Sequence, residues 1–512
     1  MNQKRVNSRT TLILVVFLLP AVAFGQAFDG LTLYNPINNR TTYLKNNSGQ
    51  TVNSWTSTNP CYIAYLLPDS TIWRMEVYSG SIMRGGPYGG LMTHYDWSHN
   101  LLESFLWSDS NHQQHHDINV MPNGHVLLIA WVRKSRAEGL AMGRLNLTGE
   151  IWPDEVIEWD PEADSVVWRW SFWDHLIQDV DPGKPNYGVV REHPELLDIN
   201  QGTIQQGGDW MHCNAVDYNV ERDEIIITSH TLSEFYVIDH STTTEEARGH
   251  TGGRHGRGGD FLYRWGNPQV YDRGTTADQV FFVAHGANWV QPGMPGAGNI
   301  LVLNNGDRPG TTADSSSIVE ITPPLDSNDH YYIHPDSAFG PRTPTWQYSN
   351  GTNFYSQHLG GAYRLPNGNT LATLGTTGRL VEVSPNRQVV WQYNTGTQTA
   401  RAMKYPLDLA GICQGSAKPM AVKPAAQPNP FRLSTVIRYA LPATSHVLLS
   451  LFDAAGRLCT TLIDRKQSPG HYEVIFPAGR REIPAGVYFA QLFIRPADGT
   501  GSVCTVKLTK TE

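Results

Sequence analysis

Charged residues are scarce in this chain, and apolar positions of helical period are not evident. Asp, Glu, Lys and Arg make up only 17% of its 512 residues, whereas 47 are Gly, 32 Pro and 15 Trp. A disordered chain carries more charge, and a helical one repeats apolar residues every three to four positions. The composition therefore indicates a turn-rich, aromatic-rich, all-β protein that is long enough for more than one domain.

Two further absences bear on function. The formal net charge of −8 argues against a general nucleic-acid-binding surface. A GxxxxGK[ST] phosphate-binding loop is also missing, so no motif indicates a nucleotide donor. We therefore expect no nucleic-acid partner, no cofactor and no metal, while positive charge concentrated in a cleft would still suit a small anionic substrate.

The long apolar run of the chain lies at its N-terminus. Lys4, Arg5 and Arg9 precede the apolar segment 12–24, and small residues follow it. This pattern is typical of a secretory signal peptide and predicts removal of residues 1–25. No later segment reaches the ~18 apolar residues of a transmembrane helix, so the mature chain is expected to be soluble or surface-attached.

Five cysteines would meet an oxidising compartment after export. Cys459 lies in the same C-terminal segment as Cys504, and Cys61 and Cys413 flank the central region. Either pair is a candidate disulfide, but sequence alone does not fix the connectivity. Cys213 belongs to neither candidate pair, and it is expected to be either a buried thiol or a residue that lines a site.

Four strand–turn–strand units recur in the central region, and a histidine precedes each turn. Two of the turns are Asn123-Gly124 and Asn367-Gly368, and Asn-Gly between apolar strands is a strong hairpin signal. The histidines of the four units are His116, His212, His285 and His358. A histidine repeated at one position of a structural unit suggests that the copies share a site.

Strands that contain tryptophan recur through the same region. They include or precede Trp107, Trp168, Trp265, Trp346 and Trp391, and the last interval of 45 residues matches one four-stranded blade of a propeller. Division of about 390 residues in this way predicts a six-bladed β-propeller, with seven blades as the alternative. The long segments 171–206 and 241–260 are expected to be insertions that cap it.

One of these insertions contains a glycine-rich, basic stretch. Its basic side chains are Arg248, His250, Arg254, His255 and Arg257. We expect a solvated loop, and the alternative is a loop that steers anionic substrates toward the mouth of the propeller.

The composition changes near Lys418, where a Pro-rich linker over 418–428 is predicted. Six short alternating strands follow, at 435–441, 447–452, 459–463, 472–476, 487–494 and 502–508. The predicted organisation is therefore a propeller over 26–417 followed by a small immunoglobulin-like β-sandwich over 429–512.

The C-terminal segment resembles the sorting domain of the type IX secretion system. The resemblance rests on Asn429-Pro430-Phe431, on the segments 437–442, 451–457 and 484–489, and on Lys507-Leu508. It implies export across the outer membrane of a Bacteroidetes-like bacterium, removal of the domain, and release or attachment at the cell surface. The alternative is an adhesive immunoglobulin-like module.

The central region resembles the bacterial arylsulfate sulfotransferases over residues 90–400. The motifs are His115-His116-Asp117, the segments 209–214 and 304–308, and Phe354-Tyr355-Ser356 running into 365–369. The resemblance implies a six-bladed propeller outside the cytoplasm. It also implies transfer of a sulfuryl group from a phenolic sulfate donor to a phenol acceptor, without a nucleotide donor.

The roles implied by this family are assigned one position at a time. His212 and His285 match substrate-contacting histidines, and Arg308 matches the arginine that binds sulfate. The family's nucleophilic histidine is expected on the strand at 375–380, where this chain has none, and His358 is the histidine available in that unit. Either another histidine is the nucleophile or the protein does not perform the transfer.

A neutral imidazole suits a covalent sulfohistidine intermediate, and arginine suits the planar array of sulfuryl oxygens. The candidate catalytic residues are His358, His285, His212 and Arg308, and the candidate substrate-binding residues are Asn214, His116 and Arg379. Two alternatives stay open: a non-catalytic surface propeller that binds an anionic or aromatic ligand, and a hydrolase that passes the sulfuryl group to water.

A structural role also stays open for each histidine, because hydrogen bonds between neighbouring strands are common in propellers. For His116 we favour that role, and we expect His115 to be exposed. A metal site built from His115, His116 and Asp117 is disfavoured, because adjacent residues on a strand point to opposite faces.

Overall fold

The computed structural model describes residues 25–310, 314–407, 425–441, 444–453, 458–468, 470–477, 484–496 and 502–511. All of the predicted signal peptide except Gly25 lies outside these residues. Most of the predicted linker lies outside them too.

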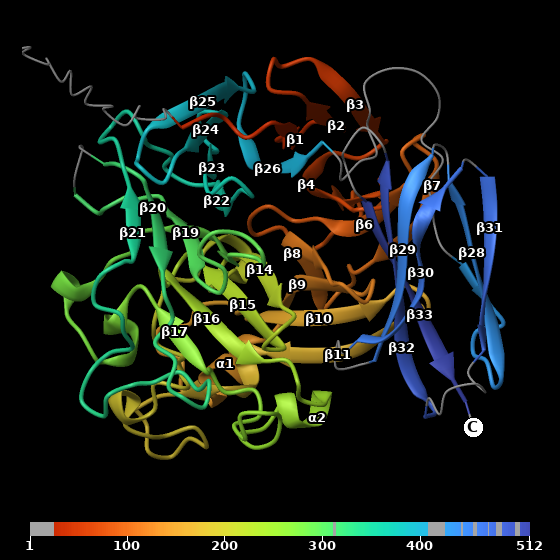
Figure 1. The fold of residues 1–512 in the computed structure, drawn as a ribbon. Helices are drawn as coiled ribbons and strands as arrows, with labels where there is room; N and C mark the ends of the chain where they lie inside the picture. The colour runs from red at the N-terminus through yellow and green to blue at the C-terminus, as the bar shows by residue number, and fades with distance from the viewer. Residues whose placement is uncertain are drawn as a thin grey trace, which may run out of the picture.

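Within the described part of residues 30–406, six four-stranded antiparallel sheets follow one another (Figure 1). From the centre outward, the first is β26 (Thr399–Pro406), β1 (Gly30–Pro36), β2 (Thr41–Lys45) and β3 (Thr51–Thr56), and the second is β4 (Cys61–Leu66), β5 (Ile72–Val77), β6 (Gly90–Tyr95) and β7 (Leu101–Leu106). The third is β8 (His112–Val120), β9 (Val126–Val132), β10 (Asp154–Asp160) and β11 (Ser165–Ser171), and the fourth is β14 (Cys213–Asn219), β15 (Glu224–Ser229), β16 (Glu234–Asp239) and β17 (Tyr263–Trp265). The fifth is β18 (Ala284–Trp289), β19 (Ile300–Asn304), β20 (Ser317–Ile321) and β21 (Trp346–Tyr348), and the sixth is β22 (Gly361–Arg364), β23 (Thr370–Leu374), β24 (Arg379–Val383) and β25 (Val389–Asn394).

The innermost strands of the six sheets form a closed ring. In the order β26, β4, β8, β14, β18 and β22, each contacts the next, and β22 contacts β26. The first sheet joins both ends of this region, because β1 pairs with β26 in the register Leu33 to Met403. This arrangement is consistent with a β-propeller, and the prediction of an all-β protein is confirmed.

The sequence repeats occupy equivalent strands of successive sheets. The five tryptophan-bearing segments form, or directly adjoin, the outermost strands β7, β11, β17, β21 and β25. His116 and His285 lie in the innermost strands β8 and β18, and His212 and His358 shortly precede β14 and β22. Equivalent positions on innermost strands lie at similar levels around the centre, so the repeat brings the histidines toward one another.

Short helices and a small sheet lie in the connections. They are α1 (Arg136–Ala141), η1 (Phe172–Asp174), η2 (Val190–Glu192), η3 (Gln206–Gly208), α2 (Thr244–Ala247), η4 (Pro268–Tyr271) and η5 (Thr276–Asp278), with β12 (Leu176–Ile177) pairing in parallel with β13 (Leu197–Asp198). No helix in the described part of the chain is long and apolar enough to cross a bilayer.

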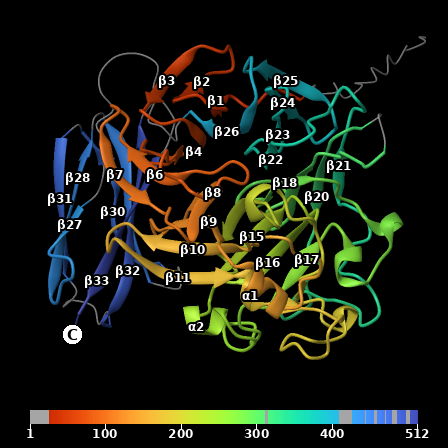
Figure 2. The same cartoon turned by 180° about the vertical axis from the view of Figure 1, so that it is seen from behind.

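The two predicted insertions pack beside the outer strands of the third and fourth sheets. Trp170 on β11 donates from Nε1 to the carbonyl of Gly259 (2.7 Å), and Arg264 on β17 donates to that of Leu196 (2.9 Å). Both views show α2 below β11, away from the ring of innermost strands (Figures 1 and 2).

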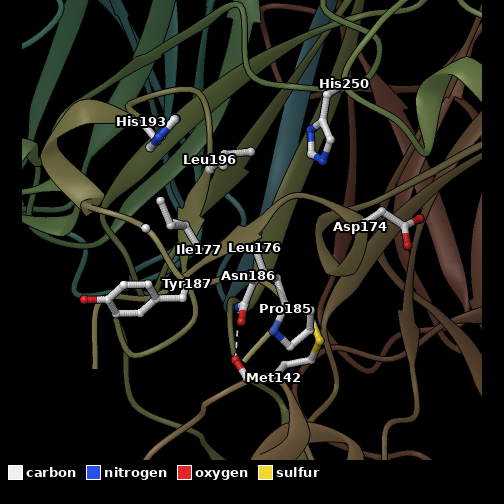
Figure 3. Close-up of a pocket in the computed structure, with 11 residues that line it drawn as sticks. Met142, Asp174, Leu176, Ile177, Pro185, Asn186, Tyr187, His193, Leu196 and His250 are labelled. Carbon is white, nitrogen blue, oxygen red and sulfur yellow. Dashed lines mark hydrogen bonds between the residues drawn. The ribbon is translucent and has the colours of Figure 1, made fainter. Parts of the chain in front are cut away.

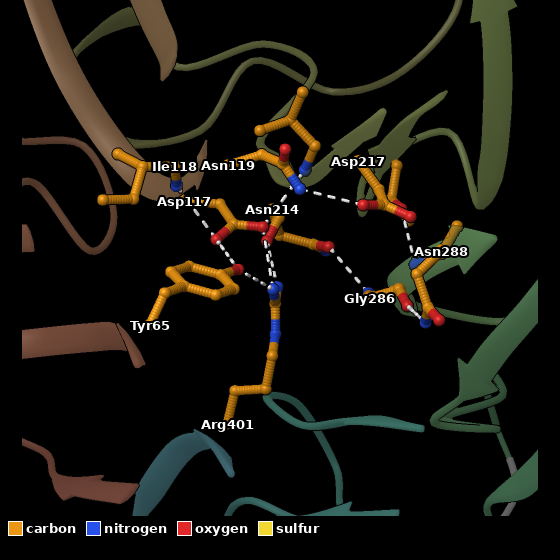
Figure 4. Close-up of polar contacts among 12 residues, drawn as sticks. Tyr65, Asp117, Ile118, Asn119, Asn214, Asp217, Gly286, Asn288 and Arg401 are labelled. Atoms are coloured by element: carbon orange, nitrogen blue, oxygen red, sulfur yellow. Dashed lines mark hydrogen bonds and ion pairs between the residues drawn. The ribbon is translucent and has the colours of Figure 1, made fainter. Parts of the chain in front are cut away.

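A buried polar network joins the innermost strands (Figure 4). Asp117 on β8 pairs with Arg401 on β26 at 2.8 Å, and it accepts hydrogen bonds from the hydroxyl of Tyr65 (2.7 Å) and the N–H of Val216 (3.1 Å). Arg401 also donates to the carbonyl of Asn214 at 3.0 Å. One ion pair thus connects four of the six innermost strands.

The same network extends to the two remaining strands of the ring. Asp217 on β14 accepts from Asn119 on β8 and from the backbone of Trp289 on β18, both at 2.8 Å. Asn288 on β18 donates to the carbonyl of Ala362 on β22 at 2.8 Å. Polar side chains at the centre are therefore used to hold neighbouring sheets together.

The C-terminal segment forms two further sheets with a shared core. One has the order β27 (Ala425–Gln427), β28 (Ser434–Leu441), β31 (Gly470–Pro477), and the other has the order β30 (Leu458–Gln467), β29 (Ser445–Asp453), β32 (Gly486–Pro496), β33 (Ser502–Lys510). All six predicted strands are present. Residues 425–427 were assigned to the linker, but they pair with 436–438 and so belong to the sheet. These sheets lie beside β7 in both views (Figures 1 and 2).

The candidate disulfides are not tested by the described residues. Cys413 and the side chain of Cys504 lie outside them. Cys61 and Cys213 are buried thiols, as expected for the latter.

The central ion pair gives a stability prediction. Arg401→Met leaves the carboxylate of Asp117 buried without its cation, so the free energy of unfolding should fall by about 3–5 kcal/mol. Urea unfolding of this variant should show the loss, and the double variant Asp117→Asn/Arg401→Met should recover part of it. A single-variant loss below ~1 kcal/mol, as for an exposed pair, would contradict the assigned role.

Candidate functional site

His116 on β8 and His212, just before the neighbouring innermost strand β14, face each other. The Nε2 atoms of His116 and His212 are 3.0 Å apart, and the two rings meet at 73°. Both residues have left-handed backbone angles, with φ of 53° and 50°. Such angles are unfavourable for residues other than glycine and often mark functional positions, because surrounding contacts must hold them in place.

The left-handed angle of His116 also corrects an expectation about His115. A register shift between Gln114 and Ile118 breaks the alternation of the strand, and the Nδ1 atoms of His115 and His116 lie 2.7 Å apart. His115 is fully buried and stacks on Trp131 with ring centroids 4.0 Å apart. The prediction that His115 is exposed is therefore wrong, because it assumed regular strand alternation.

His115, His116 and His212 form a row, and a carboxyl group lies at each end of it. Asp209 Oδ2 lies 2.5 Å from Nδ1 of His212, and its Oδ1 accepts from Nε1 of Trp131 at 3.1 Å. At the other end, Asp154 Oδ1 lies 2.7 Å from Nε2 of His115. The row therefore runs Asp154, His115, His116, His212, Asp209 and draws on residues in or next to β8, β10 and β14.

Burial shifts the pKa values of three groups in this row. It lowers the pKa of His115 to about 3 and that of His116 well below the ordinary value. It also raises the pKa of Asp154 well above the usual range, and the nearby charge of Asp209 adds to this effect. Burial thus favours the neutral form of the two histidines and the protonated form of Asp154.

Three hydrogen bonds connect the histidines of the row to Asp209. The carboxylate of Asp209 accepts from Nδ1 of His212, Nε2 of His212 accepts from Nε2 of His116, and Nδ1 of His116 accepts from Nδ1 of His115. One N–H on each imidazole supplies the three hydrogens that these contacts need. Asp154 faces the other ring nitrogen of His115 but does not form a hydrogen bond with it.

His230 extends the group of histidines beyond this row. Its ring centroid lies 4.9 Å from that of His212 and 5.4 Å from that of His285. Burial lowers its pKa to about 3, and its buried Nδ1 has no hydrogen-bond partner among the described residues. His230 therefore offers a neutral imidazole that a bound ligand can use.

His285 is committed to protein contacts through both ring nitrogens. Nδ1 donates to Oδ1 of Asn305 (2.7 Å), and Nε2 accepts from the backbone N–H of Leu359 (3.2 Å). Leu359 has a left-handed φ of 64° and directly follows His358. His285 thus positions the segment that carries His358.

His358 differs from the buried histidines because its side chain is exposed. Among the described residues, neither of its ring nitrogens forms a hydrogen bond. It adjoins Leu359, whose backbone N–H is bound by His285, and its charge contributes to the lowered pKa values of His230 and His285. Partial burial lowers its own pKa, which favours the neutral form.

Arg308 lies on the loop after β19. Its guanidinium is exposed and lies 4.6 Å from the ring of Phe282. The adjacent Asp307 accepts from the hydroxyl of Tyr355 (3.2 Å) and from the amide of Gln357 (3.4 Å). The loop of Arg308 is therefore tied to the segment that leads to His358.

The other two predicted substrate-binding residues make structural contacts. Arg379 donates to the carbonyl of Asn353 (2.9 Å) and to Gln392 on the outermost strand β25 (3.2 Å). The side chain of Asn214 donates to the carbonyl of Ala284 at 2.8 Å and so joins β14 to β18. The structure brings together His116, His212 and His285, and it places His358 next to Leu359, which His285 binds. Arg308 contacts Phe282, and no described contact joins it to these histidines.

Sequence reasoning missed the groups that complete this site. Asp209 stands three residues before His212 within the motif at 209–214, which was a usable signal. Asp154 lies on β10 and His230 directly follows β15, and neither belongs to a motif. Gly86 was also missed: a Cβ there would lie 2.4 Å from Cε1 of His212. A glycine is thus needed where the loop covers the histidine pair.

Comparison with known proteins assigns the chain to a family. The fold and the site define an all-β ring of six sheets with a group of histidines on or next to its inner strands. The family model described as arylsulfotransferase (ASST) matches residues 88–410. Since the match covers more than half of the chain, the protein belongs to the arylsulfotransferase (ASST) family.

Similarity to individual proteins is low. A Bacteroides caccae protein of unknown function has a TM-score of 0.40 and 9% identity over 74% of this chain and 99% of that one. A chain of the nidogen–laminin complex has a TM-score of 0.37 and 7% identity over 73% of this chain and 97% of that one. No curated protein matches the sequence.

The protonated state of Asp154 gives a prediction about pH. A carboxyl whose pKa is raised by folding stabilises the protein below its unfolded pKa, near 3.9, and this contribution is lost as the pH rises toward the folded pKa. Asp154→Asn replaces the titrating carboxyl with an amide of similar size and so avoids that loss. The variant should therefore gain unfolding free energy relative to the wild type between pH 4 and pH 7. Parallel pH profiles in urea unfolding would show that Asp154 is ionised in the folded protein.

Proposed function

We propose that this protein transfers a sulfuryl group from a phenolic sulfate ester to a phenol through a sulfohistidine intermediate. Membership of the arylsulfotransferase family suggests an activity of this kind. The observation that carries the proposal is the contrast between His358 and its neighbours. His358 is exposed with no recorded partner on its ring, whereas His116, His212 and His285 are held by other residues.

In the first half-reaction, a neutral ring nitrogen of His358 attacks sulfur. The S–N bond forms as the bond between sulfur and the phenolic oxygen breaks, and the electron pair of that bond leaves with the phenolate. In the second half-reaction a phenol oxygen attacks the sulfohistidine and restores the neutral ring. No nucleotide is consumed, and the donor and acceptor use the same site in turn.

The surrounding residues support charge and proton movement. Sulfuryl transfer spreads negative charge over three oxygens, and Arg308 and the unpartnered nitrogen of His230 are the groups that we assign to them. The row from Asp154 to Asp209 holds a proton between His116 and His212. We assign this proton to the departing phenolate, and the acceptor phenol returns one in the second step.

The proposal also covers architecture and location. We infer a six-bladed propeller over residues 26–417, carried through the inner membrane by the N-terminal signal peptide. The C-terminal sandwich would act as a type IX sorting signal, which places the enzyme outside the cell or at its surface. The six strands at 434–510 and the motifs at 429–431 and 484–489 support this part.

Activity is tested with 4-nitrophenyl sulfate as donor and a phenol as acceptor. Release of nitrophenolate should depend on the acceptor, and His358→Ala should lower the rate by at least about 10³-fold. His99→Ala, which removes an exposed histidine near Asn53, serves as the matched control. Release without an acceptor would indicate a hydrolase. Binding of the ester by folded protein without turnover would indicate a non-catalytic propeller.

The lowered pKa of His358 predicts the pH dependence of the transfer. The neutral ring is the nucleophile, so the rate should be flat above pH ~6.5 and fall only at lower pH, as the ring becomes protonated. Initial rates between pH 5 and 8 measure this profile. A rate that falls as the pH rises from 6 to 7 would instead require an imidazolium and would contradict the assignment.

A further inference from the structure

A second cluster of histidines lies outside the central site, where the two insertions meet. His175 follows η1, and His250 and Asp260 lie between α2 and β17. Nδ1 of His175 and Nδ1 of His250 lie 2.8 and 2.7 Å from the same oxygen, Oδ1 of Asp260. All three atoms lie within 4.8 Å of one another.

The backbone holds one ring nitrogen of His175 and leaves the other facing Asp260. Nε2 donates to the carbonyl of Ala247 at 2.9 Å, and Nδ1 faces the carboxylate of Asp260. Histidines that bind metals commonly donate their second N–H to a backbone carbonyl in this way.

Two of the three groups are fixed by packing. His175 is fully buried and Asp260 is 7% exposed. Trp170 stacks on His175 at an interplanar angle of 9° and donates to the carbonyl of Gly259. A Cβ at Gly259 would lie 2.1 Å from the Ala247 oxygen and 2.6 Å from Nε2 of His175, so only glycine fits. Buried ligands held this tightly form a preorganised site.

The basic loop is solvent-exposed at four of its five basic residues, as expected, and it is also held by contacts to the fourth sheet. Arg254 donates to the carbonyl of Arg222 at 2.6 Å, and His255 lies 3.3 Å from the carboxylate of Glu224. His250 is carried on this loop and is 60% exposed, so it closes the cluster from the solvent side.

A cavity of about 350 Å³ adjoins the cluster. His250, Asp174, His193 and Tyr187 contribute to its lining, and His250 and Asp174 lie on the same side of it (Figure 3). Because His250 belongs to both the cavity and the cluster, a cation bound there has room for water or another small oxygen ligand.

We propose that His175, His250 and Asp260 bind one divalent transition metal ion of the zinc type. Two imidazoles and one carboxylate suit Zn²⁺, Co²⁺ or Fe²⁺, whereas Ca²⁺ and Mg²⁺ prefer oxygen ligands throughout. The ion joins the insertion after β11 to the insertion before β17, and it leaves coordination positions open toward the cavity. The sequence predicted no metal, because its motifs do not place these three residues together.

Cobalt provides a spectroscopic test on the full-length protein. After treatment with a chelator and dialysis, titration with Co²⁺ should give visible absorption bands that saturate at one ion per chain and disappear on addition of Zn²⁺. His250→Ala should weaken Co²⁺ binding at least tenfold and remove the bands. Since the side chain of His250 is exposed, this variant should fold. Asp260→Asn is a second variant that lacks one of the proposed ligands.

His193→Ala is the matched control, because His193 lines the same cavity but is bonded to Glu195. It should bind Co²⁺ as the wild type does. Zn²⁺ should also raise the melting temperature of the wild type but not that of His250→Ala. The proposal is overturned if the wild type binds Co²⁺ no better than His250→Ala, or if His193→Ala loses the bands equally. Sulfuryl transfer by the chelator-treated protein is measured separately from Co²⁺ binding, because the central histidines do not contribute to this cluster.

Discussion

The ion pair between Asp117 and Arg401 is the interaction on which the centre of the molecule depends. Asp117 follows His116 directly, and Asn214 lies two residues after His212, so the contacts of the ion pair fix the two strands that carry the facing histidines. The left-handed angles at His116 and His212 cost roughly 1–3 kcal/mol each. The network next to them supplies the rigidity that holds these angles, and so it sets the distance between the rings.

This coupling explains why polar residues fill the centre of an otherwise apolar ring. Buried charges are costly unless they are paired and hydrogen-bonded, and here each is bonded to groups on several strands. The same principle operates in the row from His115 to Asp209, where each imidazole is hydrogen-bonded to the next group. The central chemistry and the central packing therefore use the same kind of interaction.

Local signals predicted much of the architecture. The Asn123-Gly124 and Asn367-Gly368 turns and the tryptophan-bearing strands located equivalent strands of the sheets, because turn chemistry and alternation depend on near neighbours in the chain. They also brought His116, His212, His285 and His358 to one region. The burial of His115 could not be predicted, since it depends on the φ angle of the next residue and on Trp131. Asp154, His230 and the cluster around Asp260 depend on contacts between segments far apart in sequence.

The pairing of β1 with β26 has a consequence for the order of folding. The first sheet takes its inner strand from residues 399–406, so it stays incomplete until nearly the whole region has been synthesised. The edge of β1 is exposed during that interval, and an unpaired edge favours aggregation or degradation. A chain that ends before residue 399 lacks both this strand and Arg401, so the ring and its central ion pair are lost together.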